Sequence, residues 1–219
     1  MKRITPFVLA LMFYTIACNN PKTETSESTT DSTAMTPPPS ATADAETAPA
    51  MDSAAMMKAW EDFRTPGEMH KLLESWNGQW NAEVSSWMDP SKPPVKSQAT
   101  NLLNPIMSGL YQTGHLSGTM MGMHFEGRSI TGYDNAKKIF VSTWIDNLGS
   151  GIVMMTGTWD EATKTLRFKG TQTDPVTGKD TPIREELKVI DENTHLLTMY
   201  GTGMDGKDMK FMEATLKRN

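Results

Sequence analysis

Side chains alternate in polarity at every second residue through most of the chain beyond Trp80, and short turn sequences interrupt this pattern. In 139–146, for example, Ile139 and Val141 fall on one side of an extended chain and Phe140 and Trp144 on the other. A period of two predicts β-strands. We expect ten strands, at 79–88, 95–103, 109–117, 123–132, 138–146, 150–159, 164–173, 181–190, 194–203 and 208–217.

The connections between these strands are too short to hold crossover helices. Asp134-Asn135 and Asp205-Gly206 are typical hairpin turns. Parallel neighbours need crossovers of about a dozen residues, so the sheet is expected to be an antiparallel meander. A long meander curls, and closure removes its edges. The sequence therefore predicts an all-β, antiparallel up-and-down β-barrel, with a two-sheet sandwich as the alternative. A β-bulge is expected near Phe211, which breaks the alternation.

A short helix is expected immediately before the strands. Thr65-Pro66-Gly67-Glu68 is typical of a helix start, with Thr65 as the cap. The stripe of Met69, Leu72, Leu73 and Trp76 would pack this helix on a larger core, and Asn77-Gly78 would end it. The Ala- and Met-rich segment 52–63 is also compatible with a helix.

The N-terminus has the pattern of an export signal. Lys2 and Arg3 precede an apolar run over 4–16, which is too short to remain as a membrane span. Cys18, the one cysteine in the chain, follows directly. The Thr15–Cys18 segment resembles the lipobox of bacterial lipoproteins, which implies cleavage before Cys18 and acylation of its sulfur and new amine. The alternative is a signal peptide with an incidental cysteine.

The predicted domain organisation has three parts: a signal peptide at 1–17, a tether at 18–58 and a folded domain at 59–219. Of residues 19–58, 26 are Ser, Thr, Ala or Pro and none is aromatic, so a disordered tether is expected. The resemblance to lipoproteins implies a lipid-anchored protein of the bacterial envelope, and Asn19 favours the outer membrane. The domain has 20 acidic and 17 basic residues without a basic stripe, which argues against a nucleic-acid partner.

Several blocks carry a resemblance to a known family. Gly78-Gln79-Trp80, after a helical turn, resembles the start of a lipocalin barrel, where the tryptophan plugs the closed end. Together with Phe125-Glu126-Gly127, Gly132-Tyr133-Asp134 and Trp144-Ile145-Asp146, it resembles an uncharacterised family of secreted bacterial domains, the domain of unknown function numbered fifteen-seventy-nine. The likeness covers roughly residues 65–218. It implies a lipocalin-like barrel and assigns no activity or catalytic residue.

The candidate ligand-binding residues are mostly aromatic. Trp144 and Asp146 share one strand face. If this face points inward, the two side chains provide an apolar wall and a polar group, as ligand pockets do. If it points outward, Trp144 covers another element and Asp146 serves the next turn. Tyr133, Met123 and Phe125 complete the candidate set.

Methionine and histidine residues offer a weaker metal-binding hypothesis. Met120–His124 is the densest methionine patch, and thioethers with a histidine suit Cu(I). Methionine also fills irregular apolar space. His115 and His124 flank a predicted turn, but no third ligand follows a recognised spacing. The alternative is that both are ordinary surface or partly buried histidines, so neither a metal nor a cofactor is assigned.

Motifs for catalysis are missing from the sequence. There is no G-x-S-x-G and no H-E-x-x-H, and Glu185 and Glu186 are adjacent on a strand and so face opposite ways. The leading hypothesis is a membrane-anchored, non-enzymatic binding module that holds a small apolar or amphiphilic ligand in the barrel. The alternatives are a structural subunit of an envelope assembly and a metal-binding protein or weak enzyme.

Overall fold

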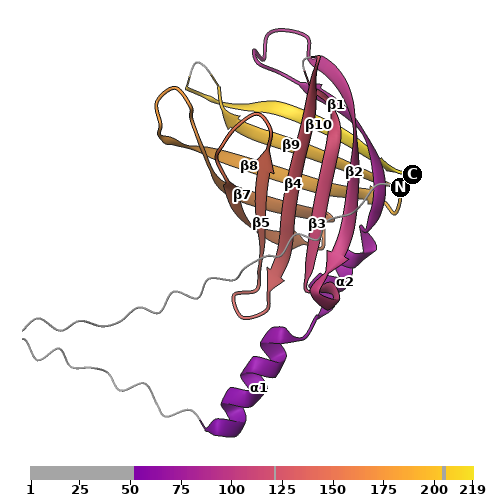
Figure 1. The fold of residues 1–219 in the computed structure, drawn as a ribbon, viewed down its shortest axis with the longest axis vertical. Coiled ribbons are helices and arrows are strands. Elements are labelled where there is room, and N and C mark those ends of the chain that lie inside the picture. The colour runs from indigo at the N-terminus through magenta and orange to yellow at the C-terminus, as the bar shows by residue number, and fades with distance from the viewer. Residues whose placement is uncertain (1–51, 121, 204–205) are drawn as a thin grey trace, which may run out of the picture. The chain divides into compact units, whose positions relative to one another are not determined.

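The computed structural model describes residues 52–120, 122–203 and 206–219 (Figure 1). The predicted signal peptide, Cys18 and the tether as far as residue 51 lie outside the described residues. The ten strands are β1 (Gly78–Ser86), β2 (Val95–Ile106), β3 (Tyr111–Met120), β4 (Met123–Asp134), β5 (Ile139–Asp146), β6 (Val153–Asp160), β7 (Thr165–Thr173), β8 (Asp180–Asp191), β9 (Thr194–Thr202) and β10 (Asp208–Arg218).

The sheet is a closed barrel in which each strand pairs with its sequence neighbours and β1 pairs with β10. Trp80 lies opposite Arg218 across this closing seam. Every strand pair is antiparallel. The prediction of an antiparallel up-and-down barrel of about ten strands is therefore confirmed, and the alternative of a two-sheet sandwich is wrong.

Two irregularities interrupt the pairing of β9 with its neighbours. The pairing of β10 with β9 shifts between Lys210 and Met212, where the alternation of the sequence predicted a bulge. A second shift lies between Val189 and Asp191, in the pairing of β8 with β9. Bulges add twist and bend a strand, which helps a sheet to close on itself.

Two helices precede the strands: α1 (Ser53–Arg64) and α2 (Glu68–Ser75). The tail of the predicted tether, 53–58, is therefore part of α1. The expected cap of α2 is wrong, because the Thr65 hydroxyl donates to the Glu61 carbonyl of α1. Instead, Gly67 caps α2, and its N–H donates to His70 Nδ1 at 3.0 Å. Neither helix of the described residues is long and apolar enough to cross a membrane.

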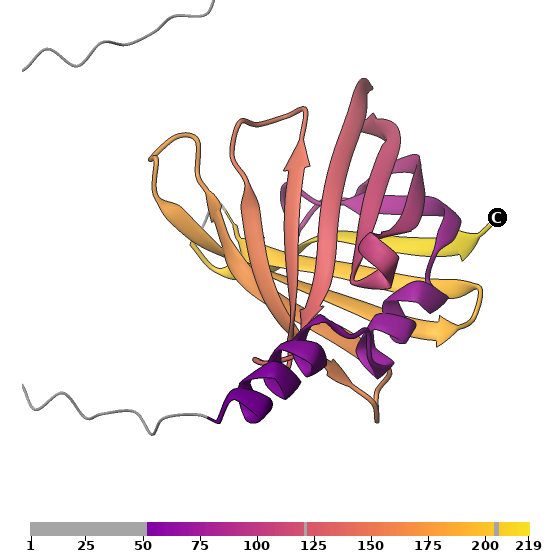
Figure 2. The same ribbon diagram turned by 60° about the horizontal axis from the view of Figure 1, so that its bottom comes forward.

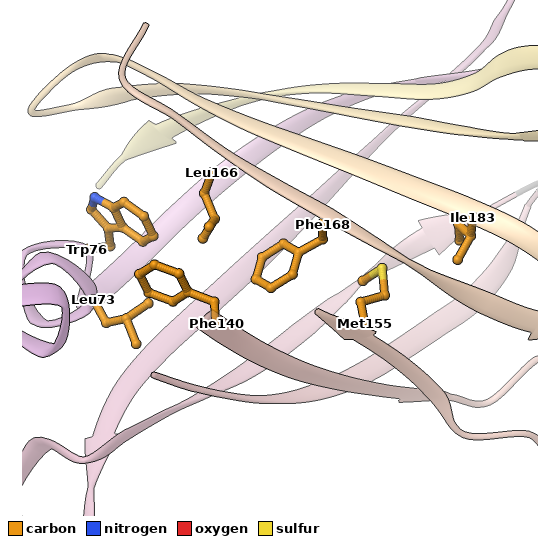
Figure 3. Packing of buried hydrophobic residues seen from close by; sticks show 7 residues of the cluster. All are labelled: Leu73, Trp76, Phe140, Met155, Leu166, Phe168 and Ile183. Carbon is orange, nitrogen blue, oxygen red and sulfur yellow. The ribbon is translucent and has the colours of Figure 1, made fainter. Parts of the chain in front are cut away.

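α2 lies across one end of the barrel, which we call the helix end (Figure 2). Its apolar stripe packs against the core there. Leu73 of α2 and Trp76, which caps its C-terminus, join Phe140, Leu166 and Phe168 from β5 and β7 in one cluster (Figure 3). Trp80 centres a second cluster with small and aliphatic side chains of β1 and β10. The opposite end of the barrel, which we call the loop end, consists of the connections that follow the odd-numbered strands.

Candidate ligand-binding cavity

A cavity of about 360 Å³ lies inside the barrel. All ten strands and α2 contribute to its wall. Apolar side chains dominate this wall, among them Leu73, Trp76, Trp80, Ala82, Val84, Ala99, Leu116, Phe125, Trp144, Met155, Leu166, Phe168, Ile183, Leu197 and Met199. The volume lies within the range of small-molecule sites.

The helix end of the cavity is sealed by bonds that tie α2 to the strands. Trp80 is 1% exposed, and its indole N–H donates to the Trp76 carbonyl at 2.8 Å. The Arg218 guanidinium stacks on this ring, 4.4 Å from its centroid, and donates to the carbonyls of Asn77 and Ser75. From β3, Gln112 donates to the Leu73 carbonyl at 2.6 Å. These contacts fix the tryptophan plug expected from the Gly-x-Trp pattern.

The cavity extends toward the loop end, where Met120 and Leu148 are among its lining residues. Leu148 lies in the connection between β5 and β6, and its side chain is 53% exposed. In the described residues, both helices contact the other end, where Asn135 also donates to carbonyls at the end of α1. The loop end is therefore the entrance that the described part of the chain offers.

Trp144, Asp146 and Phe125 line the cavity together. The Trp144 indole N–H donates to Asp146 Oδ2 at 2.8 Å, and Asp146 Oδ1 accepts the Leu148 N–H at 2.9 Å. Phe125 stacks beside Trp144, with the ring centroids 6.4 Å apart. Gly127 lets the indole lie flat on β4, because a Cβ there would clash with the Trp144 ring. The shared face of Trp144 and Asp146 thus points inward, although their binding role stays a prediction.

The other two candidate ligand-binding residues lie away from this wall. Tyr133 packs at the helix end, edge-on to Phe140 at 4.9 Å and to His70 at 5.9 Å. Met123 is 56% exposed and is not among the residues that line the cavity. Met123 shares its strand face with Phe125, but it begins β4 next to the turn at the loop end, where its side chain is exposed.

His115 and His124 do not meet across the hairpin. His115 pairs with Arg128, whereas His124 pairs with Thr119, so the two histidines lie roughly 13 Å apart along the strands. His115 Nε2 instead lies 3.0 Å from Glu126 Oε1. Arg128 is the main cause of the lowered pKa of Glu126. Among the described residues, no group of three or more His, Cys, Asp or Glu side chains could hold a metal ion.

Glu185 is the cavity residue that the sequence interpretation missed. It lies on β8 between Ile183 and Leu187, and like them it lines the cavity. Its strand neighbours on β7 and β9 are Phe168 and Met199. Burial in this apolar setting raises the pKa of Glu185 to about 7. The sequence feature that could have identified it is its place in the alternation: Glu185 falls on the same strand face as the apolar residues Ile183 and Leu187.

His195 is the one imidazole in the cavity wall of the described chain. It lies 4.3 Å from the Trp80 ring and edge-on to Trp76 at 5.7 Å. Burial, with a smaller contribution from the Arg218 charge, lowers its pKa to about 4. The side chain is therefore neutral at neutral pH and belongs to the sealed helix end. His70, also buried there, has a pKa lowered by the same cause.

These features define a class: hollow, antiparallel β-barrels with one sealed end and a mainly apolar interior. The sequence matches the family model described as "Protein of unknown function (DUF1579)" over residues 65–218. The chain belongs to this family, as the motif blocks predicted. No curated protein matches the sequence.

Two solved structures match the chain. The crystal structure of Rv2717c from M. tuberculosis has a TM-score of 0.54 and 10% identity, and the match covers 71% of this chain and 99% of the other. A redesigned β-barrel, b11L5F_LGL, matches with a TM-score of 0.34 and 17% identity, over 67% of this chain and 94% of that chain. The first likeness supports the barrel fold alone, and the second carries no argument.

Proposed function

We propose that this protein is a non-enzymatic binding module that holds a small apolar or amphiphilic molecule inside its barrel. The observation that carries the proposal is the cavity of about 360 Å³, mainly apolar and sealed at the helix end. Burial of an apolar ligand against such a wall contributes roughly 25 cal/mol for each Å² removed from water. The polar groups at Trp144 and Asp146 would orient a ligand that carries a polar atom.

The cavity also favours ligand binding over the alternative of a structural subunit. A barrel that serves only as an assembly subunit needs no internal space, and natural cores are packed with few voids larger than a water molecule. Here Ala82, Ser97, Ala99 and Ser142 occupy inward positions where larger side chains would fill the space. Small residues at these positions support ligand binding over a solid interior.

Filling the cavity is the direct test of the proposal. Ala99→Phe places a ring in the cavity, whereas Thr100→Phe places the same ring on the outer face of the same strand. With the neutral fluorescent probe N-phenyl-1-naphthylamine, we expect binding to the parent and to Thr100→Phe. Binding to Ala99→Phe should be at least about tenfold weaker, since the filled wall excludes the probe.

Equal binding by Ala99→Phe and Thr100→Phe would contradict the proposal, as would no binding to the parent protein. Circular dichroism of both variants checks that the barrel has formed. Native mass spectrometry of protein purified from its host should show the mass of a bound endogenous ligand.

The same proposal places the module at a membrane through Cys18. Its support is the sequence: the lipobox-like segment before Cys18, followed by a long Ser-, Thr-, Ala- and Pro-rich stretch. A second acyl chain makes membrane anchoring stable where one chain is marginal. The position of Asn19 favours the outer membrane of a bacterial envelope.

Cys18→Ser tests this placement. We expect the parent protein in the membrane fraction, with the mass of attached acyl chains on its N-terminal peptide. The variant should lose that mass and leave the membrane fraction. A parent protein whose N-terminal peptide carries no lipid would contradict the proposal.

A further inference from the structure

The charged groups of the cavity are all acidic at neutral pH. Among the lining residues that the structure describes, the titratable side chains are Asp146, Glu185 and His195, and none is Lys or Arg. His195 is neutral near pH 7, because its pKa is lowered to about 4. A negatively charged ligand would therefore meet like charge and no compensating base.

The two carboxyl groups differ in how they are satisfied. Asp146 accepts one hydrogen bond on each oxygen, from Trp144 and from Leu148. Glu185 has neither a hydrogen bond nor an ion pair with any described residue. Glu185 is half-buried in the cavity, and polar groups withdrawn from bulk water in native proteins normally have a hydrogen-bond partner.

No neighbouring side chain of the described residues provides a hydrogen-bond partner for Glu185, so a partner would come from a molecule in the cavity. The adjacent inward side chains on β7 and β9 are Phe168 and Met199. The one titratable side chain that β7 or β9 turns into the cavity is His195, in the sealed helix end. Glu186, next along β8, faces outward and lies 3.7 Å from Arg167.

We infer that the cavity selects amphiphiles with a protonated amine, whose N–H groups donate to the Glu185 carboxylate while the apolar chain lies against the aromatic and aliphatic wall. This inference rests on the proposed binding function of the same cavity and names its ligand class. Glu185 is the specificity-determining residue. Alcohols can bind the wall without the ion pair, and carboxylates are repelled.

The inference also predicts a pH dependence. Since burial raises the pKa of Glu185 to about 7, the ionised fraction grows strongly between pH 6 and pH 8. An aliphatic amine stays protonated over this range, so its affinity should rise with pH. The affinity of an alcohol with the same chain should stay nearly constant.

The test compares decylamine, decanol and decanoate, each below its critical micelle concentration, by calorimetry at pH 6 and pH 8. For the parent protein at pH 8 we expect decylamine to bind at least about tenfold more tightly than decanol, and decanoate to bind most weakly. Glu185→Gln should reduce decylamine binding to the level of decanol. Glu186→Gln, the outward neighbour, should leave all three affinities unchanged.

The outcomes separate the inference from the function on which it rests. Decanol binding to Glu185→Gln within about threefold of the parent shows an intact cavity. Equal binding of the three probes, or an unchanged decylamine affinity in Glu185→Gln, would overturn the selection of amines alone. Failure of all three probes to bind the parent would overturn the proposed function and the inference together.

Discussion

At the scale of single residues, Glu185 and His195 give the barrel opposing pH dependences. His195 has a pKa of about 4 in the fold and about 6.5 when unfolded, so acidification from pH 6.5 to pH 4 lowers the free energy of unfolding. Glu185 has a pKa of about 7 in the fold and 4.5 as its ordinary value, so the free energy of unfolding falls as pH rises through that window.

Glu185→Gln removes the second of these dependences. We expect the variant to exceed the parent in free energy of unfolding by about 1–3 kcal/mol at pH 8, because no carboxylate is held in the cavity. The difference should shrink toward zero near pH 4.5, where the folded parent is protonated at this site. Urea unfolding at both pH values measures it. Glu186→Gln is the control, with a change below about 0.5 kcal/mol, and equal stabilities of Glu185→Gln and parent at pH 8 would contradict the account.

The sequence predicted which residues share a strand face, but not which face points into the barrel. A period of two is enough to place Trp144 and Asp146 on one face, and the structure has them hydrogen-bonded. The period does not show which face is inside, because the opposite face, with Thr143 and Ile145, is also partly apolar. The sequence analysis considered Glu185 only as a possible catalytic pair with Glu186, and so missed that it lies in the row of Ile183 and Leu187 that lines the cavity.

At the scale of elements, Arg218 holds the helix end together. It belongs to β10, stacks on Trp80 of β1 and donates to the carbonyls of Ser75, at the end of α2, and Asn77. A third bond runs to the Glu192 carbonyl in the turn between β8 and β9. One side chain thus joins the closing seam of the barrel to the helix that seals it.

Arg218→Met keeps an apolar stem over Trp80 but loses these hydrogen bonds. We expect a loss of about 1–3 kcal/mol in the free energy of unfolding, with faster amide exchange in α2. Arg184→Met is the matched control, because Arg184 also stacks on an aromatic ring, Tyr200, but its bond partner among the described residues is exposed Asp208. Its cost should stay below about 1 kcal/mol. Equal losses in the two variants would show that Arg218 has no special structural role.

Strands were predictable because period and turn chemistry agree along the chain. The ten observed strands fall at the ten predicted places, and the bulge beside Phe211 follows from its broken alternation. The start of α2 was not predictable, because the Thr65 hydroxyl has two possible hydrogen-bond partners. Its hydroxyl could cap the following helix, but it bonds back to Glu61 in α1, a competition that the local sequence does not decide.

At the scale of the whole barrel, closure and hollowness have different origins. Closure follows from a long meander of short connections, and was predicted for that reason. Hollowness depends on the summed volume of inward side chains from all ten strands, a quantity that no local pattern contains. The helix end is filled by large groups such as Trp76, Trp80 and Phe140, while Ala99 and Ser97 leave space beyond them.

The central claim is that this space receives a ligand. A titration with decanol, followed by amide and indole resonances in two-dimensional NMR spectra, tests it most directly. The account predicts shifts at inward residues, including Ala99, Ser142 and the Trp144 indole, with outward Thr100 and helix α1 unaffected. Shifts confined to α1 and the outer face of the barrel, or no shifts at saturating decanol, would contradict it.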